Sequence, residues 1–498
     1  MVIAARTVAV NASAFASHFQ QLLELVRRSV AEGAPFALFE VELMKLLVTL
    51  GRDSVDLVLA SQGDGDLGPT VEIDGVTLAR SEKPHVRELR TLFGNHVFHA
   101  YVYGRDLDRK IEARPIDARL QLSEGKFSPR FVEVSQMLCV ETAFARAAEM
   151  LELVFGTAVS VNSLERSNRE LGTQAEEFLQ QLPVPKAVDE GEVLVVTADG
   201  KGVPMVRDAV KVPAFERREH PGNRKMATLA SVYSVDRFVC EPEQIVSALF
   251  RDTPEEEPAK RPVPVGKTVV GYLTDVDDEG EPLPGDIQAF AWAAEQVARR
   301  HREDQPLVRL MDGQASLWTT ATVCLEGRAA VDVLDIIHVS SYVWSAAKQF
   351  HPHREHQEAY ARDRLLRILH GEVAGVIAGM RRQATLNLSA KGRAAVERIC
   401  NYFETNCHRM KYDEYLKAGY PIATGVIEGA CRHLVMDRMC RTGMRWQVLG
   451  SQAMLHVRAV HQADHAKAFH AHLATRREEQ TAPLRRAMEN YAPACLCG

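Results

Sequence analysis

Two short apolar runs, each followed by Asp-Gly, constrain the fold of this chain more than any other feature. Val193–Ala198 precedes Asp199 and Gly200, and Leu307–Met311 precedes Asp312 and Gly313. A continuous apolar run of this length is typical of a strand buried on both faces of a sheet. Asp-Gly after a strand is also an ordinary turn. Two such ends in one mixed sheet, however, bring two carboxylates to the edge where functional residues gather.

The surrounding pattern predicts a mixed α/β sheet followed by helices. The stretch 252–264 is too charged and proline-rich to pack and indicates a surface loop. Residues 339–418 carry helical patterns and no strand pattern, and a last helix begins after Thr424, a plausible N-cap, and carries Glu428. The further expected elements are strands at Met226–Val235, Arg237–Cys240 and Ala329–Ile337, and helices at Glu243–Phe250 and near 287–302.

The first 190 residues predict helices, then hairpins, then helices again. Apolar residues recur at helical spacing through 14–50. Two β-hairpins follow, one turning at Asp74-Gly75 and one at Gly94-Asn95. An apolar helix over 131–155 and a polar helix over 161–179 give the outline of a helix-turn-helix, or of a packed helical hairpin. The polar residues expected to be exposed on the second helix are Asn162, Arg166, Asn168 and Arg169.

Charge and cysteine content set limits on the class of protein. The net charge is −6, so any DNA contact must come from a local concentration of basic residues. Nine cysteines without an even framework indicate reduced thiols. No apolar stretch reaches the roughly 18 residues of a membrane span, and no secretory leader is recognisable. We therefore expect no membrane association and a cytoplasmic location.

Carboxylates brought together at a sheet edge suit the chemistry of phosphodiester cleavage. In-line displacement requires activation of water or a 3′-hydroxyl and stabilisation of the leaving oxygen, and two cations about 3.5–4 Å apart do both. Mg²⁺ prefers oxygen ligands and keeps several waters, so a few carboxylates suffice. Two strand-end aspartates and an acid on a late helix form such a set.

Three segments resemble bacterial insertion-sequence transposases of the ISKra type. They are Val196–Pro204, Gly425–Val435 and Asp437–Trp446. These enzymes belong to the Asp-Asp-Glu superfamily, so the resemblance implies a ribonuclease-H-like core over about 190–460. It extends more weakly to Leu89–Gly94 and the helix-turn-helix outline.

The resemblance implies specific site residues. The catalytic, metal-binding acids fall on Asp199, Asp312 and Glu428, with two Mg²⁺ or Mn²⁺ ions per site. The helices between Asp312 and Glu428 are similar to the insertion of Mutator-like relatives. Asp335-Ile-Ile-His338 matches an Asp-x-x-His element that either supports the metal site and DNA or, as a local alternative, caps and packs the next helix.

Basic residues near these motifs are candidates for DNA contact, or else ordinary solvated side chains. A patch closed by an aromatic side chain suits backbone contact and base stacking. Relatives commonly carry Cys-x-x-Cys ribbons in the hairpin region, but residues 69–127 contain no cysteine, so no zinc is expected. The candidates are Lys201, Lys225, Arg432, His433, Arg438, Arg441, Arg445 and Trp446, with Arg87, Arg90, His96, His99 and Arg105 beside the second hairpin.

These observations predict an α+β or α/β multidomain transposase that cuts the ends of its insertion sequence and joins them to target DNA. Its partners would be double-stranded terminal inverted repeats, target DNA and further copies of itself, at the bacterial nucleoid. The alternatives are a catalytically silent DNA-binding descendant and another ribonuclease-H-like nuclease such as a resolvase. The expected regions are 1–68 (helical), 69–127 (β-hairpins), 128–189 (helix-turn-helix), 190–338 (core, first part), 339–419 (helical insertion), 420–465 (core, last part) and 466–498 (tail).

Overall fold

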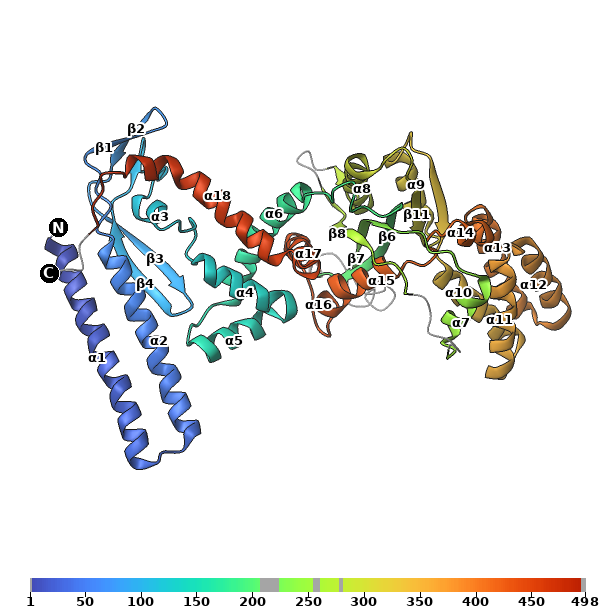
Figure 1. Cartoon of the computed structure of the whole chain (residues 1–498), viewed down its shortest axis with the longest axis horizontal. Coiled ribbons are helices and arrows are strands. Elements are labelled where there is room, and N and C mark those ends of the chain that lie inside the picture. Colours follow the sequence, from blue (N-terminus) through green and yellow to red (C-terminus); the bar gives the residue numbers. More distant parts are fainter. Residues whose placement is uncertain (1, 207–223, 254–259, 277–280, 494–498) are drawn as a thin grey trace, which may run out of the picture. The chain divides into compact units, whose positions relative to one another are not determined.

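The computed structural model describes residues 2–206, 224–253, 260–276 and 281–493. The chain divides into two compact units (Figure 1). Unit 1 comprises residues 1–170 and 465–498, and unit 2 comprises residues 171–464. None of the described helices is both long and apolar enough to cross a bilayer.

Unit 1 begins with a long helical hairpin of α1 (Val2–Glu32) and α2 (Phe36–Ser61), which confirms the helical pattern and extends it in both directions. The turn between them contains Gly33 at a φ of 62°, a conformation that glycine adopts without strain. Figure 1 shows the two helices side by side, projecting beyond the strands of unit 1.

The two predicted hairpins form, but the second turns at a different place. β1 (Thr70–Ile73) and β2 (Val76–Arg80) turn at Asp74-Gly75, both with positive φ, as predicted. In the second hairpin Gly94 is paired with Thr91, so Leu92 and Phe93 form the turn. The prediction of a turn at Gly94-Asn95 was wrong, because both residues belong to β4. The remaining strands are β3 (His85–Thr91), β4 (Gly94–Ala100) and β5 (Tyr103–Gly104).

Helices complete unit 1. The single helix expected over 131–155 is broken at Thr142-Ala143, where the chain is extended, giving α4 and α5. Gly156 ends α5 in the left-handed conformation, a common C-cap. The expected C-terminal tail instead forms a helix, which contacts α3 and β1. The helices are α3 (Pro115–Arg119), α4 (Pro129–Glu141), α5 (Phe144–Phe155), α6 (Val161–Gln181), which continues into unit 2, and α18 (Ala466–Ala487).

Unit 2 is built on a five-stranded mixed sheet of order β12-β11-β6-β7-β8. Three strands that follow one another, β6, β7 and β8, pair antiparallel, while β11 and β12 add in parallel. This arrangement is broadly compatible with the predicted ribonuclease-H-like core. The strands are β6 (Val193–Pro204), β7 (Arg224–Val235), β8 (Val265–Leu273), β11 (Leu307–Met311) and β12 (Ala330–Leu334), with a small separate pair, β9 (Asp275–Val276) and β10 (Pro282–Leu283).

One strand prediction in this sheet was wrong, and one strand was missed. Arg237–Cys240 is not a strand, and the third strand is β8, where Gly266 and Gly271 interrupt the apolar pattern. The part of the predicted surface loop at 254–259 lies outside the described residues.

Helices cover the sheet and fill the expected insertion. The segment between β12 and Thr424 is helical in the structure, as predicted. Tyr412 and Tyr415 donate to the carbonyls of Leu334 and Asp332, both at 2.8 Å, and thereby tie the insertion to β12. The helices are α7 (Pro242–Phe250), α8 (Gly285–Arg300), α9 (Ala315–Cys324), α10 (Ile336–Phe350), α11 (Arg354–Leu369), α12 (Val373–Asn387), α13 (Ala390–Asn406), α14 (Tyr412–Lys417), α15 (Gly425–Ala430), α16 (Asp437–Met439) and α17 (Val448–Gln462).

Candidate active site

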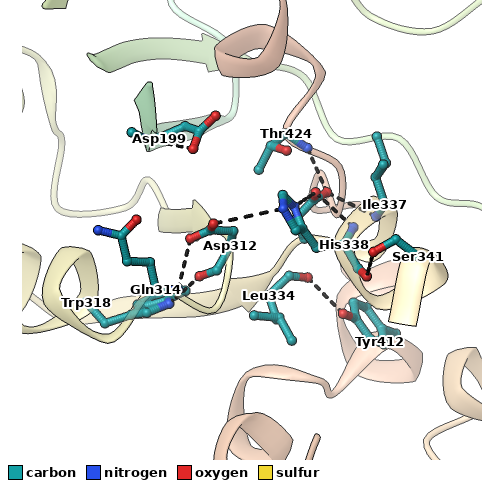
Figure 2. Close-up of polar contacts among 12 residues, drawn as sticks. Asp199, Asp312, Gln314, Trp318, Leu334, Ile337, His338, Ser341, Tyr412 and Thr424 are labelled. Carbon is teal, nitrogen blue, oxygen red and sulfur yellow. Dashed lines mark hydrogen bonds and ion pairs between the residues drawn. The ribbon is translucent and has the colours of Figure 1, made fainter. Parts of the chain in front are cut away.

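Parallel pairing brings Asp199 and Asp312 to neighbouring positions. Met311 is the partner of Ala198, so the next residue on each strand is an aspartate. The prediction that the first strand ends at Ala198 was wrong, because β6 continues antiparallel to β7 as far as Pro204. Asp199 therefore lies inside β6, just past the limit of its parallel pairing. Figure 2 shows the two side chains on these adjacent strands.

The backbone around Asp312 is firmly held. Its carboxylate accepts a 2.9 Å hydrogen bond from the Gln314 amide, and its carbonyl accepts one of 2.6 Å from the Trp318 indole. The Arg409 guanidinium lies 4.1 Å from the Trp318 ring centroid, a cation–π contact. A Cβ on Gly313 would lie 2.3 Å from the Tyr402 ring, so glycine is required after the aspartate. The Asp-Gly pair is thus a packing feature as well as a turn.

Asp335 is completely buried and joins three parts of the site. It is the N-cap of α10, accepting hydrogen bonds from the amides of Ile337 and His338, both at 3.2 Å. The Thr424 amide, just before α15, donates to the same carboxylate at 3.0 Å, and so does Nδ1 of His338. Because four N–H groups use its oxygens, we infer that Asp335 fixes the start of α10 and of α15.

His338 is oriented by Asp335 toward the strand-end acids. Its Nδ1 lies 3.0 Å from Asp335 Oδ2, and its Nε2 lies 3.9 Å from Asp312 Oδ2 (Figure 2). The hydrogen bond with Asp335 is the largest cause that raises the pKa of His338. A carboxylate behind an imidazole is the usual way in which proteins set the tautomer and orientation of a metal-binding histidine.

Glu428 comes from α15, which packs against β6 and β7. The structure puts the start of this helix after Thr424, as predicted, but no Thr424 side-chain cap forms. Ligand atoms of Asp335, His338 and Glu428 lie within 4.8 Å of one another, which among the described residues is the one group of this kind. α15 thus places Glu428 next to Asp335 and His338, at the start of α10.

The three acids share one electrostatic environment. Burial is the largest cause that raises the pKa of both Asp312 and Glu428, and the negative charge of Asp199 raises each further. The His338 side chain opposes both shifts. Acids that repel one another in a partly buried site are stabilised by a bound cation.

The donor set fits a hard divalent cation. Asp199, Asp312 and Glu428 offer carboxylate oxygens, and His338 offers Nε2 next to them. Oxygen-rich sets of this kind suit Mg²⁺ or Mn²⁺. Asp199 and Asp312 are not in the group of close ligand atoms formed by Asp335, His338 and Glu428. The roles of these residues remain predictions, which the geometry permits.

A π-helical segment follows Glu428 and was not predicted. Residues Cys431–Met436 are π-helical, a feature that is frequent at functional sites. Buried Arg458 on α17 donates hydrogen bonds to the carbonyls of His433 and Leu434. These bonds stabilise carbonyls of the π-helical segment, in which the usual α-helical hydrogen bonds are not formed. The Cys431 thiol lies beside Asp199, and burial together with that charge raises its pKa. No local sequence pattern distinguishes these two residues.

The predicted DNA-binding residues do not all reach the surface. Arg438 and Trp446 are buried and form a cation–π pair at 5.0 Å. Lys225 is half-buried and donates to the Thr274 carbonyl at 3.2 Å. Lys201 is half-buried in β6. The exposed candidates, for which DNA contact remains a prediction, are Arg432, His433, Arg441 and Arg445.

In unit 1, two predicted surface residues are buried and paired with an acid. Arg87 pairs with Asp117 at 2.9 Å, and His96 Nδ1 lies 2.7 Å from Asp56. Neither is free to contact DNA. Asn168, expected to be exposed on the second helix of the helix-turn-helix outline, is also buried. Arg90, His99, Arg105, Asn162, Arg166 and Arg169 are not buried.

Comparison with known proteins adds little to this geometry. No protein-family model matches the sequence, and no curated protein matches it. Among solved structures, the chain is similar to a chain of the "Drosophila P element transposase strand transfer complex", with 10% sequence identity and a TM-score of 0.21, over 73% of this chain and 84% of that chain. A TM-score of this size carries no argument about fold or function. The assignment to an ISKra-type family therefore stays a prediction.

Proposed function

We propose that this protein is a DNA transposase of the Asp-Asp-Glu class. The observation that supports it best is the placement of Asp199 and Asp312 at neighbouring positions of two parallel strands, with Glu428 on a helix packed against β6 and β7 and the charge of Asp199 acting on both other acids. Burial and the charge of Asp199 raise the pKa of Asp312 and of Glu428, and acids with raised pKa in a partly buried site are typical of catalytic centres.

The residues have distinct parts in the proposed reaction. Asp199, Asp312 and Glu428 would hold Mg²⁺ or Mn²⁺, with His338 beside Asp312. The bound ions supply activation of a water or 3′-hydroxyl and charge stabilisation at phosphate. Asp335 acts through His338 and Thr424, since its carboxylate fixes the ring and the start of α15. The exposed Arg432, Arg441 and Arg445 would contact the phosphate backbone.

The finer proposal is an insertion-sequence enzyme that acts on the terminal inverted repeats of its own element. It rests on the resemblance of Val196–Pro204, Gly425–Val435 and Asp437–Trp446 to ISKra-type transposases. In this proposal the enzyme cuts the element ends, directs the 3′-hydroxyls into target DNA, and works at the bacterial nucleoid with more than one copy on the DNA.

Two alternatives keep the same fold but change the activity. A catalytically silent descendant would bind DNA without cutting it, and a resolvase-like nuclease would cut branched DNA regardless of element ends. The retained triad favours an active enzyme over the first. The helical segment inserted between β12 and Thr424 has no evident use in the second.

The test mixes the full chain with a supercoiled plasmid that carries the DNA flanking its own reading frame, with Mg²⁺, Mn²⁺ or chelator. We expect metal-dependent nicks at two defined ends. Asp199→Asn, Asp312→Asn and Glu428→Gln should each lower cleavage on the order of 10³-fold or more, since the lost metal ligand contributes several kcal/mol. The matched control is Asp304→Asn, an exposed acid outside the site.

The outcomes separate the three functions. Full cleavage by any of the three acid variants would overturn the catalytic assignment. Tight binding to the ends without cleavage would favour the silent descendant. Cleavage of a four-way junction but not of the element ends would favour the resolvase-like nuclease. A gel-shift assay on the same variants distinguishes lost catalysis from lost binding.

A further inference from the structure

The α1–α2 hairpin of unit 1 presents an apolar stripe that its own fold does not cover. On α1, Phe19, Leu23 and Val26 are 44%, 36% and 44% exposed, and Val30 is 81% exposed. Large apolar side chains clustered in this way on a soluble protein mark an interaction surface. Ala9, Ala12 and Ala16 continue the stripe toward the N-terminus and are also exposed.

The exposed stripe has the spacing of a coiled-coil seam. Residues 9, 12, 16, 19, 23, 26 and 30 alternate steps of three and four, the heptad pattern of positions a and d. A second heptad seam, at residues 8, 11, 15, 18, 22, 25 and 29, lies one residue earlier. This second seam packs on α2: His18 contacts Asp53 at 2.6 Å and Asn11 donates to the Asp56 carbonyl at 3.0 Å.

Two seams offset by one residue prepare α1 for two neighbours. One residue corresponds to about 100° around a helix, close to the angle between the neighbours of a helix in a four-helix bundle. One neighbour is α2, and the other is missing. The remaining face of α1 carries the polar, exposed side chains of Ser17, Gln20, Gln21, Glu24, Arg27 and Arg28, with Val10 as an exposed apolar residue toward the N-terminus.

The exposed seam is complementary to itself when reversed. Its N-terminal half is alanine and its C-terminal half is large. An antiparallel copy centred between Ser17 and His18 would place each alanine opposite a large residue: Ala9 opposite Val26, Ala12 opposite Leu23, and Ala16 opposite Phe19. Facing small and large side chains interdigitate without voids. In a parallel pair, alanine would face alanine and leave gaps.

From this self-complementarity we propose that the exposed seam of α1 binds the same seam of a second copy of this chain, antiparallel, forming a four-helix bundle from two α1–α2 hairpins. Such a contact is isologous: if residue 12 touches residue 23 of the partner, residue 23 touches residue 12. The hairpin carries five basic and six acidic residues over 2–61, which does not suit DNA as the occupant. The proposal is independent of the proposed function.

The test is a charge exchange across one layer of the seam. We measure the dimer dissociation constant of the full chain, without DNA, by sedimentation equilibrium. Ala12→Glu and Leu23→Lys alone should each weaken the dimer about 100-fold or more, because a charge is buried without a partner in two symmetric layers. The double variant should recover to within about tenfold of wild type, because each introduced glutamate would face an introduced lysine of the other copy only in the antiparallel arrangement. Gln21→Lys, on the polar face, is the matched control and should leave the dimer unchanged.

A cross-link tests the same register independently. Residues 9 and 26 of one helix lie about 25 Å apart, so their thiols cannot react within a chain. Ala9→Cys with Val26→Cys should give a covalent dimer under mild oxidation, and Ala9→Cys alone should give no more than wild type. A monomeric wild-type chain at tens of micromolar, a dimer unaffected by either charge variant, or a cross-link formed by Ala9→Cys alone would each overturn the proposal. Circular dichroism checks that each variant keeps its helices.

Discussion

Unit 2 buries polar side chains around its sheet, whereas the α1–α2 hairpin of unit 1 exposes apolar side chains to solvent. β6 is buried through Val193–Ala198, and the informative residues of unit 2 are buried polar side chains next to the sheet, such as Asp335 at the start of α10 and His456 on α17. In the hairpin, very few residues are buried, and the informative ones are apolar side chains in water, such as Leu23. Buried polar groups and exposed apolar patches are the departures from ordinary packing that indicate function.

A buried polar group and an exposed apolar group have different physical causes. A buried carboxylate is stable only if its oxygens are satisfied, so Asp335 reveals what it holds together. An exposed apolar seam costs little in the monomer but is kept for a partner.

Removing the Asp335 carboxylate should have the largest effect. Asp335→Ala deletes an N-cap and leaves the buried Thr424 amide without its acceptor, which together cost about 3–5 kcal/mol. All four tryptophans lie in unit 2, so tryptophan fluorescence in a urea titration reports its unfolding. The control is Ser389→Ala, an ordinary N-cap of α13, which should cost about 1 kcal/mol. Equal losses for both variants would contradict the joining role of Asp335.

The buried His456 should make unit 2 sensitive to acid. Burial lowers the pKa of His456 from 6.5 to about 4, since the protonated ring is poorly solvated there. For a lowered histidine pKa, the stability is fully present above pH 6.5 and is lost as the pH falls toward 4, because the unfolded chain takes up the proton first. The loss over that window is about 3 kcal/mol.

His456→Gln should remove that part of the pH dependence, even if it lowers the stability at pH 7. The measurement is the free energy of unfolding from tryptophan fluorescence at pH 7 and pH 4.5. The exposed His408→Gln is the control and should keep the wild-type slope. An unchanged slope for His456→Gln would contradict the burial argument.

The sequence predicted the elements that local patterns determine. The apolar runs before Asp199 and Asp312, the Asp74-Gly75 turn and the helical insertion are all local, and the structure contains them. The length of β6 is not determined by its own residues. It depends on β7, which continues to pair with β6 past Asp199, as far as Pro204. β8 was not predicted because Gly266 and Gly271 interrupt its apolar pattern, and because its pairing with β7 cannot be read from its own residues.

The sequence pointed to candidate acids, whose role stays a prediction, but it did not reveal the contacts around them. Asp199, Asp312 and Glu428 stand in short motifs, whereas the bonds that hold them cross long distances in sequence. The Asp335 carboxylate meets the Thr424 amide 89 residues later. Unit 1 has a pair of the same kind outside the site, in which Arg87 meets Asp117 30 residues later. A charge count therefore predicted Arg87 as a surface residue, because the pairing partner that allows its burial is invisible locally.

The smallest effect distinguishes the two seams of α1 by a matched pair of leucines. Leu25 is 5% exposed and packs within unit 1, whereas Leu23 is 36% exposed on the proposed dimer seam. Leu25→Ala should lower the opening free energy of the hairpin by about 2–3 kcal/mol at any protein concentration. Leu23→Ala should cost under about 1 kcal/mol when the protein is dilute and monomeric, and more at concentrations where wild type is dimeric, because only the dimer buries that side chain. Hydrogen exchange of α1 amides measures both. A Leu23→Ala cost that does not change with concentration would show that the seam has no partner in a second copy.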